Sequence, residues 1–188
     1  MKRYEAVVIG TSAGGLNVLS EILKELPGDF PLPVMIVQHR AKDESYLLEE
    51  ILRAKCRIKI KQADEKENII KGTVYFAPPN YHLLVERDHT LSLSNDQLVN
   101  YSRPAIDILF ETAASVYKNK LIGIILTGAN KDGSAGIKAI KKNGGMTIAE
   151  NPGTAEYYLM PKEAIDTGYV DSVMETEEIK NFLLSINC

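Results

Sequence analysis

The sequence predicts an α/β protein: a doubly wound, mostly parallel sheet with helices on both faces and a small β-hairpin excursion. Three apolar runs, at residues 6–9, 34–37 and 121–126, show no polar alternation, which is typical of strands buried on both faces of a parallel sheet. Segments with apolar residues at helical spacing alternate with these runs. That alternation favours crossovers between parallel strands in an open sheet.

The composition indicates one globular domain, and we expect residues 1–188 to form it. The net charge of −3 lacks the basic surplus of a nucleic-acid-binding protein. No apolar run approaches the roughly 20 residues that span a bilayer, and the N-terminus has no signal-peptide segment. We therefore expect a cytoplasmic protein with no nucleic-acid partner and no membrane insertion. Cys56 and Cys188 are isolated and follow no metal spacing, which predicts reduced thiols and no metal site.

The turn at residues 10–15 joins the first strand to a helix that begins near Gly15. It reads Gly-Thr-Ser-Ala-Gly-Gly, with Ser12 at its middle. Three interpretations compete: a phosphate cradle, a plain tight connection, or a G-x-S-x-G elbow that presents Ser12 as a nucleophile. The glycines match neither phosphate-binding pattern, whereas residues 10–14 match the elbow literally.

The second apolar run ends before Gln38, so His39 lies at the carboxyl end of a predicted strand. Leucine and isoleucine spacing within residues 47–52 predicts a helix, and residues 57–61 alternate as an edge strand does. Residues 72–94 change to short strands with tight turns, which predicts the β-excursion. His82 and His89 lie there, and we expect structural or surface roles for both.

In the second half of the chain, Pro104 suits the first turn of a helix that continues to about residue 117. Asp107 falls in the same turn, where its charge suits the helix dipole. The strand at residues 121–126 leads into a loop that holds Asp132, an N-cap or turn aspartate on the plainest interpretation. The later predicted elements are a strand at 144–149, a helix from 160, a strand at 169–171 and a helix over 179–186.

Ser12, His39 and Asp132 all follow the carboxyl ends of predicted buried strands. In doubly wound sheets the ligand crevice lies beyond that edge. Ester hydrolysis needs a hydroxyl, a base that takes its proton and an acid that orients the base, and these residue types supply all three. Position alone leaves two alternatives open, a catalytic triad or three independently placed loop residues.

Six blocks of sequence, in order, resemble the catalytic domain of chemotaxis protein-glutamate methylesterases, the CheB family. They are residues 10–15, 37–39, 75–85, 103–110, 126–136 and 160–161. The resemblance implies a doubly wound sheet, a Ser-His-Asp triad and no cofactor or metal. It also implies hydrolysis of glutamate methyl esters on chemoreceptor cytoplasmic helices, often with glutamine deamidation. By motif, Ser12 matches the nucleophile, His39 the base, Asp132 the orienting acid and the Ala129 backbone N–H the oxyanion donor.

The chain departs from the family's usual pattern in places. Ala129-Asn130 stands for the usual Met-Gly, Ala13 for Thr, and Ser102 for a His. The family usually carries an N-terminal receiver domain, whereas this chain starts close to its first strand. We therefore expect a stand-alone enzyme or a fragment, with a separate regulatory partner in place of that domain. A nucleotide- or anion-binding α/β module and a serine hydrolase for a different ester remain the alternatives.

Overall fold

A computed structural model describes residues 4–40 and 47–186 of the chain. Its main sheet has seven strands, and every neighbouring pair is parallel. Across the sheet, the strands are β10 (Ser172–Met174), β9 (Met146–Glu150), β8 (Leu121–Ile125), β1 (Ala6–Thr11), β2 (Val34–Gln38), β5 (Thr73–Phe76) and β3 (Lys59–Gln62). The predicted parallel sheet is confirmed.

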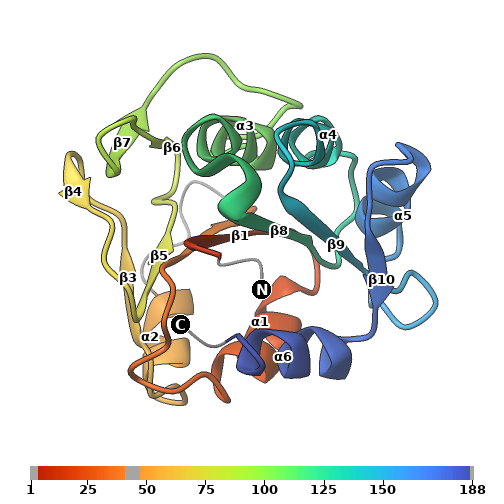
Figure 1. Ribbon diagram of the computed structural model, residues 1–188, viewed down its shortest axis with the longest axis horizontal. Helices are drawn as coiled ribbons and strands as arrows, with labels where there is room; N and C mark the ends of the chain where they lie inside the picture. The colour runs from red at the N-terminus through yellow and green to blue at the C-terminus, as the bar shows by residue number, and fades with distance from the viewer. Residues whose placement is uncertain (1–3, 41–46, 187–188) are drawn as a thin grey trace.

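Helices cover both faces of this sheet (Figure 1). One face carries α1 (Gly15–Leu23), α2 (Leu47–Arg53) and α6 (Thr176–Leu184); the other carries α3 (Ile106–Tyr117), α4 (Ser134–Lys142) and α5 (Leu159–Asp166). A short 3-10 helix, η1 (Lys118–Lys120), follows α3. Side chains alternate between the two layers: Ala6 and Val8 pack on the α3 side, and Val7 and Ile9 on the α1 side. Burial on both faces explains why these strands read as continuous apolar runs.

The β-excursion predicted over residues 72–94 is only partly confirmed. Strands β6 (His82–Val85) and β7 (Thr90–Ser94) form a small antiparallel sheet with β4 (Glu67–Asn68), whereas residues 73–76 form β5 of the main parallel sheet. Leu83, Val85 and Leu91 of this sheet join the core under α3. His82 is buried, with Nδ1 accepting a hydrogen bond from the Ala105 N–H (3.1 Å). His89 makes an edge-to-face contact with the Tyr117 ring. Both histidines therefore contribute to packing here.

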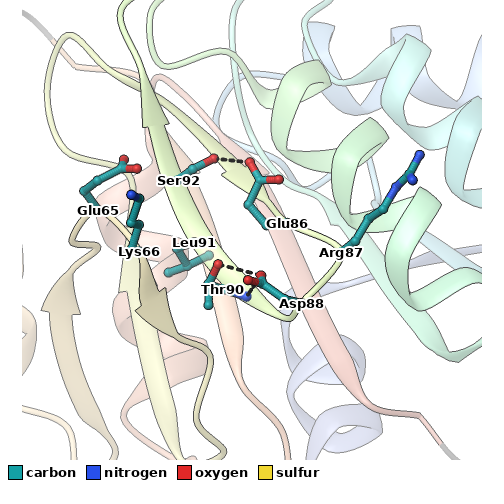
Figure 2. A pocket seen from close by; sticks show the side chains of 8 residues that line it. All are labelled: Glu65, Lys66, Glu86, Arg87, Asp88, Thr90, Leu91 and Ser92. Atoms are coloured by element: carbon teal, nitrogen blue, oxygen red, sulfur yellow. Dashed lines mark hydrogen bonds between the residues drawn. The ribbon is translucent and has the colours of Figure 1, made fainter.

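A pocket of about 670 Å³ lies on the β6–β7 hairpin, and Figure 2 shows the side chains around it. Two of its polar pairs are already bonded to each other, Ser92 to Glu86 (2.5 Å) and Thr90 to Asp88 (2.7 Å). The hairpin turn lies close to the amino ends of the parallel strands. His89, in this turn, and Glu5, just before β1, line the same cavity. This pocket is thus remote from the opposite edge, where the strands end.

Several element boundaries differ from the sequence-based expectation, and two of the differences have an identifiable physical cause. Helix α3 begins at Ile106 rather than at Pro104, because the first helical N–H groups are bound by the Asp132 carboxylate. The last strand is Ser172–Met174 rather than residues 169–171. Asp171 instead ties the incoming chain to β9, accepting the Thr147 N–H at 3.0 Å. Side-chain hydrogen bonds determine both of these boundaries, and hydrophobic periodicity cannot predict them.

The order of the strands positions the site. Strand β1 is central, between β8 and β2. Ser12 follows β1, His39 follows β2, and the loop after β8 carries Asp132. All three residues therefore lie at the carboxyl edge of adjacent parallel strands. No helix in the described ranges has the length and apolar character needed to cross a membrane. Cys56 is half-buried and free, while Cys188 lies outside the described residues.

Candidate active site

Ser12 lies in the tight turn between β1 and α1. Its backbone N–H donates to the Thr127 carbonyl, and its own carbonyl accepts the Gly15 N–H, both at 3.0 Å. Gly14 has φ 79°, a left-handed conformation that glycine adopts without steric cost. The side chain is half-buried, and its Oγ has no hydrogen-bond partner within residues 4–40 and 47–186. The turn thus holds a free hydroxyl at the positive end of α1.

Gln38, the last residue of β2, joins the segments that carry Ser12 and His39. Its Nε2 donates to the Ser12 carbonyl (2.7 Å) and to the His39 carbonyl (2.9 Å). The side chain can reach both because Gly15 has none: a Cβ there would lie 1.9 Å from Gln38 Oε1. Nothing in the sequence pattern assigned a role to Gln38. A polar residue that closes an otherwise apolar strand was the available signal.

The structure brings His39 and Asp132 together. His39 Nε2 lies 2.8 Å from Asp132 Oδ2. The Asp132 carboxylate also accepts the backbone N–H groups of Ile106 (2.7 Å), Asp107 (3.2 Å) and Gly133 (3.0 Å), and the Asn100 amide (3.0 Å). Asp132 is therefore more than an ordinary turn aspartate, because it joins His39 to the start of α3.

The charge state of Asp132 follows from these bonds. Burial by itself raises the pKa of this carboxyl group, but the hydrogen bonds from His39 and the Ile106 N–H outweigh it and lower the pKa below 3.8. Asp132 is thus ionised at neutral pH and accepts a proton-bearing Nε2 from His39. When the imidazole is neutral, Nδ1 is then its basic nitrogen.

Asn130 binds that basic nitrogen. Its Nδ2 lies 3.1 Å from His39 Nδ1, and its Oδ1 accepts the Asp132 N–H at 3.0 Å. A backbone N–H can only donate, so the oxygen of the amide faces Asp132 and the NH2 group faces His39. His39 is therefore bonded on both ring nitrogens, and neither bond is to Ser12.

Ser12 and His39 are nevertheless neighbours across the sheet. Thr11 pairs with Gln38 in the β1–β2 register, and the His39 N–H donates to the Thr11 carbonyl at 3.0 Å. The two residues thus directly follow a paired position on adjacent strands, which run about 4.8 Å apart. The two side chains therefore start from neighbouring positions at this edge of the sheet.

Ala129, the expected oxyanion donor, is exposed in the loop after β8. The loop is fixed on one side of it: the Gly128 N–H donates to the Tyr157 carbonyl (3.0 Å), and the Gly128 carbonyl accepts the Met160 N–H (2.9 Å). The Ala129 N–H has no acceptor within the described part of the chain. It is available to an oxygen that comes from outside.

A pocket of about 210 Å³ adjoins His39. It is lined by Arg40, Leu98, Tyr101, Ser102, Arg103 and Pro104 as well. The Arg103 guanidinium organises this wall through bonds to Asn80 Oδ1 and to the Asn95 and Asp96 carbonyls. Tyr101 is 97% exposed and leaves an aromatic ring at the rim. The residues that the structure describes hold no cluster of His, Cys, Asp and Glu that could bind a metal ion.

The chain is similar to known proteins over nearly its whole length. The sequence profile described as CheB methylesterase matches residues 7–183. A Leptospira interrogans protein, provisionally named protein-glutamate methylesterase/protein-glutamine glutaminase, is 52% identical over 184 residues, covering 98% of this chain and 95% of its own. The protein-glutamate methylesterase/protein-glutamine glutaminase of Clostridium acetobutylicum is 37% identical over 97% of this chain, which spans 53% of that longer relative. The crystal structure of the Thermotoga maritima CheB methylesterase catalytic domain superposes with a TM-score of 0.93 at 35% identity, covering 98% of this chain and 99% of that one.

Proposed function

The chain belongs to the CheB methylesterase family of chemotaxis enzymes, and on that premise we propose how it performs the family's protein-glutamate methylesterase/protein-glutamine glutaminase reaction. The substrates are methyl-esterified glutamates, and glutamines at the same sites, on the cytoplasmic helices of chemoreceptors. The enzyme works in the cytoplasm. Ser12 is the nucleophile, His39 the general base, Asp132 the orienting acid and the Ala129 N–H the oxyanion donor.

In the first half of the reaction, Ser12 Oγ attacks the ester carbonyl and passes its proton to His39 Nδ1. The carbonyl oxygen becomes an oxyanion, which accepts the Ala129 N–H; a donor of this kind typically contributes about 3 kcal/mol. His39 then gives the proton to the departing methoxy oxygen, methanol leaves, and Ser12 carries the glutamyl acyl group. Asp132 stays ionised throughout and keeps the Nε2 proton of His39 in place.

In the second half, His39 removes a proton from water, and the resulting hydroxide attacks the acyl carbon. The glutamate side chain leaves as a carboxylic acid, and the proton returns from His39 to Ser12 Oγ. With a glutamine substrate the same steps release ammonia in place of methanol. His39 relays the proton in each of these steps.

One observation carries the proposal: the 2.8 Å hydrogen bond between His39 Nε2 and the ionised Asp132, one strand away from a free serine hydroxyl. An ionised, buried acid that holds one ring nitrogen makes the other ring nitrogen the base. The 210 Å³ pocket beside His39 supports the proposal, because it leaves room for a side chain next to the proposed base.

The test is labelling with a fluorophosphonate serine probe, together with methanol release from methylated receptor. We expect stoichiometric labelling of Ser12 and loss of both signals in Ser12→Ala. Ser115→Ala is the matched control, because Ser115 is exposed on α3 and, among the described residues, its Oγ bonds only to Thr112 O. Methanol release at the normal rate from Ser12→Ala would refute the assignment. Absent labelling with tight nucleotide binding would favour the anion-binding alternative, and labelling without methanol release would favour a different ester.

A further inference from the structure

The proton acceptor of the proposed mechanism is already occupied in the structure. A neutral imidazole has one lone pair in the ring plane, on the nitrogen that carries no proton. In His39 that nitrogen is Nδ1, because Nε2 donates to the ionised Asp132. The Asn130 NH2 group donates into this lone pair at 3.1 Å. The same lone pair has to receive the Ser12 proton, so the two hydrogen bonds exclude each other.

Few contacts hold the Asn130 side chain in this position. It is half-buried and lies between the exposed residues Ala129 and Lys131. Two side-chain hydrogen bonds hold it, one to His39 Nδ1 and one from the Asp132 N–H. A rotation about its χ1 angle breaks both bonds and leaves the hydrogen bond between His39 and Asp132 intact.

We propose that Asn130 is a removable cap on the catalytic base. With no substrate present, its amide covers His39 Nδ1 and separates the base from Ser12. A substrate that enters the pocket beside His39 displaces the amide, and Ser12 then binds Nδ1. Asn130 acts through His39 and is therefore a positioning residue. The inference rests on the proposed function, since a cap matters only if His39 serves Ser12.

The cap predicts opposite effects for two substitutions at one position. Asn130→Gly removes the competing donor, so the probe should label Ser12 faster, by about 3- to 10-fold for one neutral hydrogen bond. Asn130→Asp places a carboxylate at Nδ1, which holds a proton on that nitrogen and removes the base; labelling should slow by tenfold or more. A merely structural role for Asn130 would slow the reaction in both variants.

The experiment measures the second-order rate of fluorophosphonate labelling and the hydrolysis of 4-nitrophenyl acetate, using the full chain. The control is Asn119→Gly, since Asn119 is exposed at the opposite edge of the sheet. Thermal unfolding is followed in parallel. We expect Asn130→Gly to melt at a lower temperature, because the Asp132 N–H loses its acceptor, and yet to react faster. If Asn130→Gly does not fold, Asn130→Ala is judged by the same criterion.

Equal or slower labelling of Asn130→Gly, with labelling still dependent on Ser12, would overturn the cap and leave the proposed function standing. Absence of labelling in the unsubstituted chain as well, with methanol release unaffected by Ser12→Ala, would overturn both. The two failures are therefore distinguishable.

Discussion

Asp107 and Asp132 cross-link helices α3 and α4 at their N-terminal ends. Asp132, which precedes α4, accepts the first two N–H groups of α3, those of Ile106 and Asp107. Asp107, in α3, accepts the N–H of Gly136 in the first turn of α4 at 2.7 Å. The Asn100 amide donates to both carboxylates, at 2.8 Å and 3.0 Å. The orientation of the proposed catalytic acid is thus coupled to the packing of two helices.

This exchange gives Asp107 a second role beside the expected one in the first turn of its own helix. It also predicts a pH dependence of stability. Burial, with a further contribution from the nearby Asp132 charge, raises the pKa of Asp107 from 3.8 to about 6. The folded state therefore holds this proton more tightly than the unfolded chain does. The resulting stabilisation is complete below about pH 4 and is lost as the pH rises through about 6.

We expect wild type to lose about 2 kcal/mol of unfolding free energy relative to Asp107→Asn between pH 4.5 and pH 7.5. Asparagine does not titrate, so the difference between the two proteins isolates this carboxyl group. Urea unfolding at the two pH values measures it. A difference that does not change with pH would contradict the prediction.

Gln38→Met should impair both stability and catalysis. The substitution keeps the length of the side chain but removes the donor to the Ser12 and His39 carbonyls. We expect a loss of about 1–3 kcal/mol of unfolding free energy, since both carbonyls lose a partner. We also expect kcat to fall about 10- to 100-fold, because the proposed nucleophile and base are no longer held together. Gln62→Met, at the end of the edge strand β3, is the control and should change kcat little.

Gly15→Ala should act through Gln38. The new methyl group would lie 1.9 Å from Gln38 Oε1 and 2.7 Å from Thr11 Oγ1, so the Gln38 side chain has to move. We expect a loss of about 1–3 kcal/mol of stability and a fall in kcat. In a Gln38→Ala background the same substitution should lower the free energy of unfolding clearly less, because the Gln38 side chain that obstructs the methyl group is absent. At Gly153 the nearest atom would be 3.3 Å away, so Gly153→Ala is the control. Equal losses of unfolding free energy in both backgrounds would contradict an effect through Gln38.

Arg40 and Glu49 form a buried ion pair directly after the proposed base. The two side chains are 3% and 0% exposed, and both guanidinium Nη atoms bond the carboxylate. Arg40→Met leaves Glu49 as an unpaired buried charge, which should cost about 3–5 kcal/mol. The double variant Arg40→Met/Glu49→Leu should recover most of that loss. Unfolding free energies from a double-mutant cycle test this, and additive costs would contradict it.

Hydrophobic pattern was sufficient for much of the fold. Runs such as residues 6–9 and 34–37 identified buried parallel strands because both faces of each strand pack on helices. Among the boundaries that it missed are the start of α3, at Ile106 rather than Pro104, and the last strand, Ser172–Met174 rather than residues 169–171. In both places side-chain hydrogen bonds from distant segments set the limit, and such bonds leave no periodic signal in the sequence.

The sequence by itself determined that Ser12, His39 and Asp132 follow the ends of buried strands, because burial and turn chemistry are local properties of the chain. Only the tertiary structure decided which strands are neighbours, and so which of these ends meet. It joined His39 to Asp132, placed Asn130 on the other ring nitrogen and set Gln38 between two backbones. The physical reason is that a hydrogen bond depends on positions to within a few tenths of an ångström, and those positions are fixed by strand order, register and close backbone approach.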